Sequence, residues 1–333
     1  MDNSSLILTL LNMNGWGPKR VFDYIRKYCF DYEQAKNGLV LELDDYEKNE
    51  FKSKYVKVKE IISNNLSKGI KTCSILDSVF PKKLYAGKEK CIFLYYVGNI
   101  ELLNTKSITI VGTRKPNEEF ALKGKVATEY FTKKGYTIVS GLALGCDTIA
   151  HENCVLNNGN TIAILPSPCD DIQPVSNRKL AYDIVETGGL LISEYGTGEP
   201  FNKFNYAARD RIQSLLSNVL LVIQSTDEGG TRIAVKKSLD DNKHVYAIKG
   251  NVLKLVKEYI DVENIDDLKK IESQIIWCLL FRRLFYLLYV NAYFLIIKDF
   301  CIIINEDIVF LFYFISISDK IFLEEEMILC WKK

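Results

Sequence analysis

Three glycine-rich segments contain the residues best suited to bind a ligand, and each follows a run of apolar residues. They are Gly112-Thr113-Arg114, the stretch from Ser140-Gly141 to Gly145, and Gly229-Gly230-Thr231. Glycine lets a backbone approach a ligand closely, while free N–H groups and arginine bind phosphate oxygens. None of the segments matches G-x-G-x-x-G or the Walker A motif, which disfavours ordinary dinucleotide and NTPase sites. Together they indicate phosphate binding, although turn geometry alone would explain any one of them.

Further arginines follow two other apolar runs. Arg178 comes directly after Asn177, and Arg209 and Arg211 flank Asp210. Two arginines around one aspartate can form a self-satisfied ion pair or clamp a polyanion. Both possibilities remain open from the sequence.

Two other groups of side chains contain the residue types of a catalytic or metal site. Ser140, Asp147 and His151 have the types of a hydrolase triad, but Ser140 lacks the G-x-S-x-G elbow. We expect this trio to fix a loop onto its helix and predict no catalytic residue. The cysteines and histidine that could suggest zinc match no usual ligand spacing, so we predict no metal site. These residues are Cys146, His151, Cys154 and Cys169.

The elements that position these segments follow from an alternation of apolar runs and helix-length segments over residues 91–250. Short, continuously apolar runs are typical of strands buried on both faces, and the alternation predicts a doubly wound, mainly parallel α/β sheet. Ligands bind such sheets at the carboxyl ends of the strands, where the glycine-rich segments lie. The expected strands are Cys91–Val97, Ile108–Val111, Thr137–Val139, Thr161–Leu165, Leu190–Ser193, Val219–Ile223 and Val245–Ile248.

Residues 1–75 are expected to form a small helical domain. Gly15-Trp16-Gly17 separates two short amphipathic segments, as in the hairpin of helix-hairpin-helix or SAM-like modules. In such a hairpin the glycines let backbone N–H groups approach a phosphate. A Gly-Pro junction is also a common turn, so DNA contact and plain helical packing both remain open.

The C-terminal segment, residues 251–333, has an atypical apolar composition with no Gly, no Pro and one Ala. We expect the core to occupy residues 76–250 and its sheet to end with the strand at 245–248. The uncharged runs at 284–297 and 308–318 are shorter than the roughly 20 residues that cross a bilayer, so we do not expect membrane insertion. The segment could bind a partner or aggregate. We favour the interpretation that residues from about 272 onward are a frame read past a disrupted gene end.

Charge and composition exclude one class of nucleic-acid-binding protein. The chain has 333 residues and a net charge of +1, which excludes a protein that coats nucleic acid by bulk positive charge. Any nucleic-acid site must therefore be a local patch. Nine irregularly spaced cysteines and the absence of a basic and apolar leader in residues 1–20 favour a cytoplasmic protein.

The order of the motifs resembles the DNA-processing protein A (DprA/Smf) family over about residues 75–250. The matching motifs are Val111-Gly112-Thr113-Arg114, the segment from Ser140 to His151, the segment from Asp171 to Leu180, Ser193-Glu194-Tyr195, Arg209-Asp210-Arg211-Ile212 and Gly229-Gly230-Thr231. The resemblance implies a Rossmann-like domain that binds single-stranded DNA and loads a RecA-type recombinase during DNA uptake, transformation and recombination. It implies a mediator and not an enzyme, with no cofactor, and it is compatible with a homodimer.

The resemblance also assigns the DNA-binding residues. Gly112, Thr113 and Arg114 match the family's Gly-Ser-Arg loop. Asp210 stands where the family has Asn, and its carboxylate lowers the local positive charge. The remaining expected contacts to DNA or phosphate are Ser140, Gly141, Gly145, Asn177, Arg178, Arg209, Arg211, Gly229, Gly230 and Thr231.

Two alternatives belong to the same superfamily. One is an enzyme of the lysine-decarboxylase-like (LOG) group, which cleaves nucleoside monophosphates and carries Pro-Gly-Gly-x-Gly-Thr-x-x-Glu. The turn Glu228-Gly229-Gly230-Thr231 lacks both the further Gly and the catalytic Glu of that motif. The other alternative is a nucleotide-binding sensor.

Overall fold

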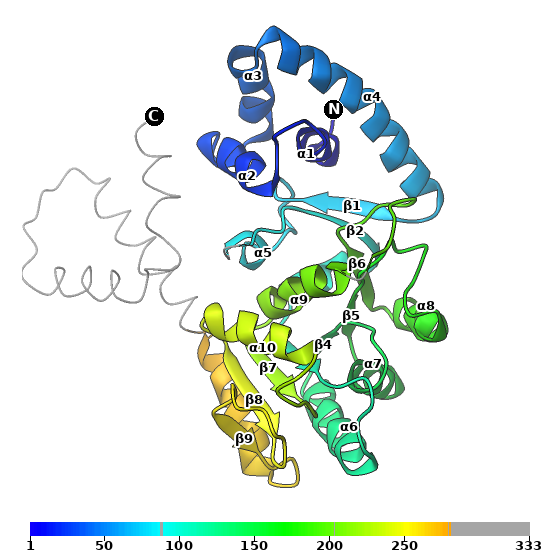
Figure 1. Cartoon of the computed structure of the whole chain (residues 1–333), viewed down its shortest axis with the longest axis vertical. Helices are drawn as coiled ribbons and strands as arrows, with labels where there is room; N and C mark the ends of the chain where they lie inside the picture. The colour runs from blue at the N-terminus through cyan, green and yellow to red at the C-terminus, as the bar shows by residue number, and fades with distance from the viewer. Residues whose placement is uncertain (87–88, 203, 279, 281–333) are drawn as a thin grey trace, which may run out of the picture.

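A nine-stranded sheet forms the centre of the computed structural model, which describes residues 1–86, 89–202, 204–278 and 280 (Figure 1). The strands are β1 (Lys71–Ser74), β2 (Phe93–Gly98), β3 (Ser107–Val111), β4 (Thr137–Ser140), β5 (Thr161–Ile164), β6 (Leu190–Ser193), β7 (Val219–Val222), β8 (His244–Ile248) and β9 (Glu258–Ile260). Their order is β1-β2-β6-β5-β4-β3-β7-β8-β9. The α/β class is therefore confirmed.

The path of the chain reverses at β3. From β3 it moves outward through β4 and β5 to β6, and it then returns to β7 on the other side of β3. All pairs from β6 to β9 are parallel. The mainly parallel, doubly wound sheet is thus confirmed, with a topological switch point between β3 and β7. The strand expected at 91–97 is present, but it pairs antiparallel with β6, with Tyr95 opposite Ser193.

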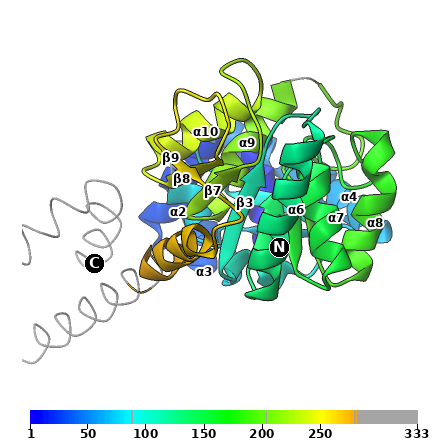
Figure 2. The ribbon, with the colours of Figure 1, turned by 90° about the horizontal axis from the view of Figure 1, so that it is seen from below.

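Helices cover both faces of this sheet (Figure 2). One face carries α6 (Glu118–Lys133), α7 (Cys146–Leu156) and α8 (Arg178–Glu186), and the other carries α9 (Phe204–Leu216) and α10 (Thr231–Asp240). Helix α6 begins where Asn117 accepts a hydrogen bond from the N–H of Phe120 at 2.9 Å, which is an N-cap. The apolar stripe that includes Phe120, Ala127 and Phe131 is buried against the sheet.

The N-terminal residues are helical as expected, and they pack on the β1 edge of the sheet (Figure 1). The helices are α1 (Asn3–Leu11), α2 (Pro18–Lys27), α3 (Tyr32–Glu42) and α4 (Asp45–Ser67). Their apolar core is continuous with that of the sheet, since Leu6 and Leu191 belong to one cluster. Strand β1 follows α4 directly, so part of the expected helical domain is an edge strand of the sheet. Three further short elements are α5 (Lys83–Ala86) and η1 (Ile100–Asn104), on either side of β2, and η2 (Val175–Asn177), which precedes α8.

The turn between α1 and α2 is held against α4. Trp16 is buried, and its indole Nε1 donates to Glu47 at 3.3 Å. The Arg20 guanidinium stacks over the Trp16 ring at 4.1 Å and also pairs with Glu47 at 2.9 Å. These contacts favour the packing interpretation of the hairpin, because Trp16 and Arg20 already have partners.

The expectation that the sheet ends at residues 245–248 is wrong. β9 pairs in parallel with β8, and a helix over residues 265–278 packs on the same face as α6. Leu268, Ile271 and Ile275 are buried at the i, i+3 and i+7 positions of that helix. The hydrophobic core of the sheet therefore extends past residue 250, although that segment contains no Gly or Pro to mark turns. The disrupted-end interpretation concerns residues from about 272 onward, of which the structure describes 272–278 and 280. Within that part Ile275 is buried in the core. The two long uncharged runs of the tail lie outside the described residues.

Among the described helices, none combines the length and the hydropathy that a bilayer crossing requires.

We expect Ile271→Ala to lower the free energy of unfolding by about 2–5 kcal/mol, because a fully buried side chain leaves a cavity when it is truncated. Ile276→Ala is the matched control on the same helix, since Ile276 is 42% exposed and should cost less than about 1 kcal/mol. Urea denaturation of both variants measures the difference. Equal, small effects would mean that the segment after residue 250 contributes nothing to the core.

Candidate functional site

A cavity of about 420 Å³ opens at the switch point between β3 and β7. Its walls are the loops after β3 and β7, part of the loop after β4, Asp147 at the start of α7, the face of α9 from Tyr206 to Gln213, and the first turn of α10. Crevices at such switch points are the usual ligand sites of open parallel sheets. Seven of the predicted residues line it: Gly112, Thr113, Arg114, Arg209, Gly229, Gly230 and Thr231.

Glycine permits the close packing of the loops around the cavity. A Cβ atom on Gly112 would lie 2.4 Å from Sγ of Cys146, at the start of α7. Gly145 has a φ of +77° and lies so close to the preceding loop that a Cβ would be 2.5 Å from the carbonyl carbon of Arg114. The Cys146 N–H donates to the carbonyl oxygen of Thr113 at 3.1 Å. These glycines shape the cavity, because they let the loops after β3 and β4 meet backbone to backbone.

Arg114 is the exposed cation of the cavity. Its guanidinium carbon lies 4.9 Å from the centroid of the Tyr206 ring, which is a cation–π contact. No carboxylate of the described residues forms an ion pair with it. The side chain therefore packs against an aromatic ring and stays exposed at the cavity.

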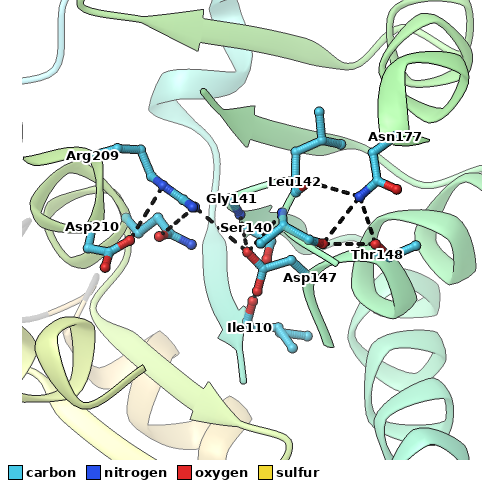
Figure 3. Close-up of polar contacts among 11 residues, drawn as sticks. Ile110, Ser140, Gly141, Leu142, Asp147, Thr148, Asn177, Arg209 and Asp210 are labelled. Atoms are coloured by element: carbon cyan, nitrogen blue, oxygen red, sulfur yellow. Dashed lines mark hydrogen bonds and ion pairs between the residues drawn. The ribbon is translucent and has the colours of Figure 1, made fainter. Parts of the chain in front are cut away.

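Arg209 is a buried cation with its own partners (Figure 3). Its Nη1 lies 3.7 Å from Asp147 Oδ2 and donates to Gln213 Oε1 at 2.9 Å, while its Nε lies 3.4 Å from Asp210 Oδ1. A Cβ atom on Gly141 would lie 1.0 Å from Nη1, so only glycine leaves room for this guanidinium. The sequence left open whether Arg209 forms a self-satisfied ion pair or clamps a polyanion. The structure shows the self-satisfied ion pair.

Asp147 fixes the loop after β4 onto α7. Its carboxylate accepts hydrogen bonds from the N–H groups of Gly141 at 3.1 Å and Ala143 at 3.3 Å (Figure 3). Burial raises the pKa of Asp147 to about 6, while the Arg209 charge and these two N–H groups oppose that rise. The carboxylate therefore serves the structure of the loop.

The other two members of the Ser140, Asp147 and His151 trio have separate partners. The Ser140 hydroxyl donates to the carbonyl of Ile110 at 2.6 Å. His151 Nδ1 lies 2.8 Å from the Thr161 hydroxyl, and burial lowers the pKa of His151 to about 3. The three side chains do not form a relay. Only Asp147 fixes the loop onto its helix as expected, whereas Ser140 and His151 bind residues of β3 and β5. Among the residues that the structure describes, no three His, Cys, Asp or Glu side chains gather around a point that could hold a metal ion.

The remaining predicted residues do not line the cavity themselves. Asn177 is buried and donates to the carbonyl of Leu142 at 2.9 Å and to the Thr148 hydroxyl at 2.8 Å, so it supports the loop after β4. Arg211 pairs with Glu194 at 2.6 Å. The Arg178 side chain is 41% exposed, and its nearest carboxylate is 3.9 Å away. The predicted residues outside the lining are Ser140, Gly141, Gly145, Asn177, Arg178 and Arg211.

Two lining residues, Tyr206 and Gln213, were not predicted from the sequence. Tyr206 and Gln213 lie three residues before and four residues after Arg209 on α9, which places all three on one face of the helix. Helical spacing around Arg209 is the signal that could have identified them. Asp210, which the sequence marked as an added negative charge, lines the cavity as well.

The charges of the cavity are divided between its two ends. On the inner wall, Arg209 is balanced by Asp147 and Asp210. Toward solvent lie Arg114, Glu228 and the first turn of α10, where Gly230 is the N-cap and no side chain caps the helix. Uncapped N–H groups give a helix N-terminus a partial positive charge. The outer end therefore suits an anion, and the inner end suits an uncharged polar group.

Comparison with known proteins places this geometry in a family context. Residues 71–258 match the family model described as DNA recombination-mediator protein A. The chain is 33% identical over 180 residues to the DNA processing protein DprA of Streptococcus pneumoniae, covering 54% of this chain and 63% of that protein. It is 34% identical over 176 residues to the protein Smf of Synechocystis, covering 52% and 44%. The match thus spans less than two thirds of the length of either relative.

Two solved structures have similar folds. The DNA processing protein A of Helicobacter pylori, described for its single-stranded DNA binding mode, superposes with a TM-score of 0.54 at 25% identity. The match covers 61% of this chain and 96% of that one. The DprA of Streptococcus pneumoniae also has a TM-score of 0.54 at 25% identity, with 82% and 88% covered. The Rossmann-like architecture is shared with both.

We expect Asp147→Asn to steepen the rise of stability with pH between about 4 and 6. The native state holds the Asp147 proton more strongly than the unfolded chain does, so Asp147 makes the unfolding free energy fall as pH rises through this window. His151 acts in the opposite sense, because its lowered pKa makes the unfolded chain bind the extra proton below about pH 6.5. In the Asp147 variant only the His151 contribution remains. The slope of the unfolding free energy against pH therefore changes by at most about 1.4 kcal/mol per pH unit. Urea denaturation at several pH values measures both slopes. Identical slopes would contradict the raised pKa.

Proposed function

The chain belongs to the DNA recombination-mediator protein A family, and on that premise we propose that it binds single-stranded DNA at the carboxyl edge of its sheet. One observation carries the proposal. Arg114 is exposed, has no ion pair in the described chain, and stands beside the Tyr206 ring at the mouth of the cavity.

The proposed contacts divide between phosphate and base. Arg114 and the first N–H groups of α10 bind phosphate oxygens, and the Tyr206 ring offers a stacking surface for a base. Such binding depends strongly on salt and only weakly on sequence, because every nucleotide carries a phosphate and a π-face. The single-stranded DNA binding described for the Helicobacter pylori relative supports single-stranded DNA as the ligand.

The proposal includes the protein partner. We propose that the bound strand is protected and then transferred to a RecA-type recombinase in the cytoplasm, as the family resemblance implies. No catalytic step, metal ion or cofactor takes part in this function. Arg178 and Arg211 remain proposed secondary contacts, with Arg211 limited by its pair with Glu194.

A titration of labelled oligo-dT against duplex of equal length, at two salt concentrations, tests the function. We expect tighter binding to the single strand and a loss of affinity as salt rises. Equal affinity for both forms, or no binding to either, would overturn the proposal. Release of free base from a nucleoside monophosphate would instead favour the phosphoribohydrolase alternative.

We expect Arg114→Ala to weaken binding of oligo-dT by about 1–3 kcal/mol, the range of a charge-assisted hydrogen bond. The thermal midpoint should change little, because Arg114 is exposed and supports no core contact. Lys125→Ala is the matched control, since Lys125 is an exposed cation on α6 that does not line the cavity. Fluorescence anisotropy measures affinity. Unfolding of the Arg114 variant, or equal losses in both variants, would move the site elsewhere.

Asp210→Asn should strengthen the same binding by about 1 kcal/mol, the Coulomb energy of two unit charges about 4 Å apart in water. Its carboxylate lines the cavity and repels phosphate, while an Asn side chain keeps an oxygen for Arg209 Nε. Asp240→Asn, at the far end of α10, is the control and should leave affinity unchanged. Unchanged or weaker binding in the Asp210 variant would show that this carboxylate does not oppose the DNA.

A further inference from the structure

The inner wall of the cavity carries one hydrogen-bond donor without an acceptor. Gln213 is 1% exposed and lines the cavity, and its Nε2 donates no hydrogen bond to any described group. The neighbouring Arg209 Nε is not in the same position, because it lies 3.4 Å from Asp210 Oδ1 in an ion pair. Buried donors without partners are rare because each costs about 1–3 kcal/mol. The place of Gln213 Nε2 at the wall of a cavity indicates that a polar ligand group belongs there.

The opposite wall is open and suits an anion. A Cβ atom built on Gly229 or Gly230 would meet nothing within 4 Å, so space remains above the start of α10. The helix has no side-chain N-cap, and Arg114 stands at the same end of the cavity. The Tyr206 ring lies between the two ends, 4.9 Å from the Arg114 guanidinium carbon and 5.9 Å from that of Arg209.

We propose that this cavity binds one free nucleoside 5′-monophosphate. The phosphate lies at the outer end against Arg114 and the first turn of α10, and the uncharged base stacks on Tyr206 and accepts a hydrogen bond from Gln213 Nε2. The division follows from charge: Arg209 is already balanced by Asp147 and Asp210, so the inner wall does not favour a further anion. Glu228, at the outer loop, is the carboxylate that the phosphate must avoid.

The size of the cavity agrees with this ligand. Its volume of about 420 Å³ lies within the range of roughly 300–1,000 Å³ that is usual for small-molecule sites. The inference rests on the proposed function in one respect, because it assigns the same cavity to one nucleotide unit. It adds that a mononucleotide binds without a strand and competes with DNA.

Calorimetric titration of the full chain with thymidine 5′-monophosphate, thymidine and inorganic phosphate tests the inference. We expect the nucleotide to bind at least about tenfold more tightly than either fragment, because only the nucleotide reaches both walls. It should also displace labelled oligo-dT. Phosphate binding as tightly as the nucleotide would reduce the cavity to an anion site and overturn the inference.

Two variants locate the contacts. Gln213→Leu keeps a similar side-chain volume and removes the donor, so nucleotide affinity should fall about fivefold, the loss of one hydrogen bond. Gln34→Leu, an exposed position on α3, is the matched control and should change nothing. If Gln213→Leu impairs folding, Tyr206→Ala is the second variant. Loss of stacking on the ring should lower nucleotide affinity at least about fivefold. Unchanged affinity in a folded variant at both positions would overturn the assignment.

The failures of the two proposals are distinguishable. Oligo-dT that binds and depends on Arg114, together with a nucleotide that neither binds nor competes at millimolar concentration, overturns this inference and leaves the proposed function intact. Failure of both ligands to bind overturns both.

Discussion

The buried guanidinium of Arg209 is the constraint on which the binding edge depends. A cation taken out of water needs paired carboxylates, and removing one partner of such a pair typically costs about 3–5 kcal/mol. Asp147 and Asp210 supply those charges, and Asp147 also holds the N–H groups of Gly141 and Ala143. Gly141 must lack a side chain because Nη1 occupies that space. One ion pair thus joins α9, α7 and the loop after β4, and it fixes the inner wall of the cavity.

A consequence of this pairing is that the two arginines of the cavity differ in what they can do. The Arg209 charge is neutralised inside the fold by Asp147 and Asp210. The exposed Arg114 side chain packs on the Tyr206 ring and forms no ion pair within the described residues. A chain with a net charge of +1 can therefore present a cation at one edge without a basic surface elsewhere. Affinity for an anion then depends on the geometry of a few groups and not on the total charge.

Much of the fold follows from local patterns, because strands buried on both faces and the stripe that includes Phe120 and Phe131 leave clear periodicities. The position of the cavity follows as well, since glycine-rich loops after parallel strands share one side of the sheet. The direction of β2 and the presence of β9 could not be predicted in this way. Strand direction depends on the route of the chain between elements, and Glu258–Ile260 is too short to show a period.

The burial of Arg209 could not be predicted from the sequence either, for a different reason. An arginine near a helix start has the same local pattern whether it faces solvent or a carboxylate far along the chain, and Asp147 is 62 positions away. The contact between Arg209 and Asp147 forms only in the folded chain, where α9 and α7 lie on opposite faces of the sheet and these two side chains come together at its edge. The same holds for Gln213, whose amide accepts from Arg209 and keeps its own N–H groups unpaired. Tyr206 and Gln213, at helical spacing from Arg209, line the cavity beside the motif loops. The glycine-rich motifs therefore form one part of the cavity wall, while one face of α9 supplies the polar and aromatic groups of another part.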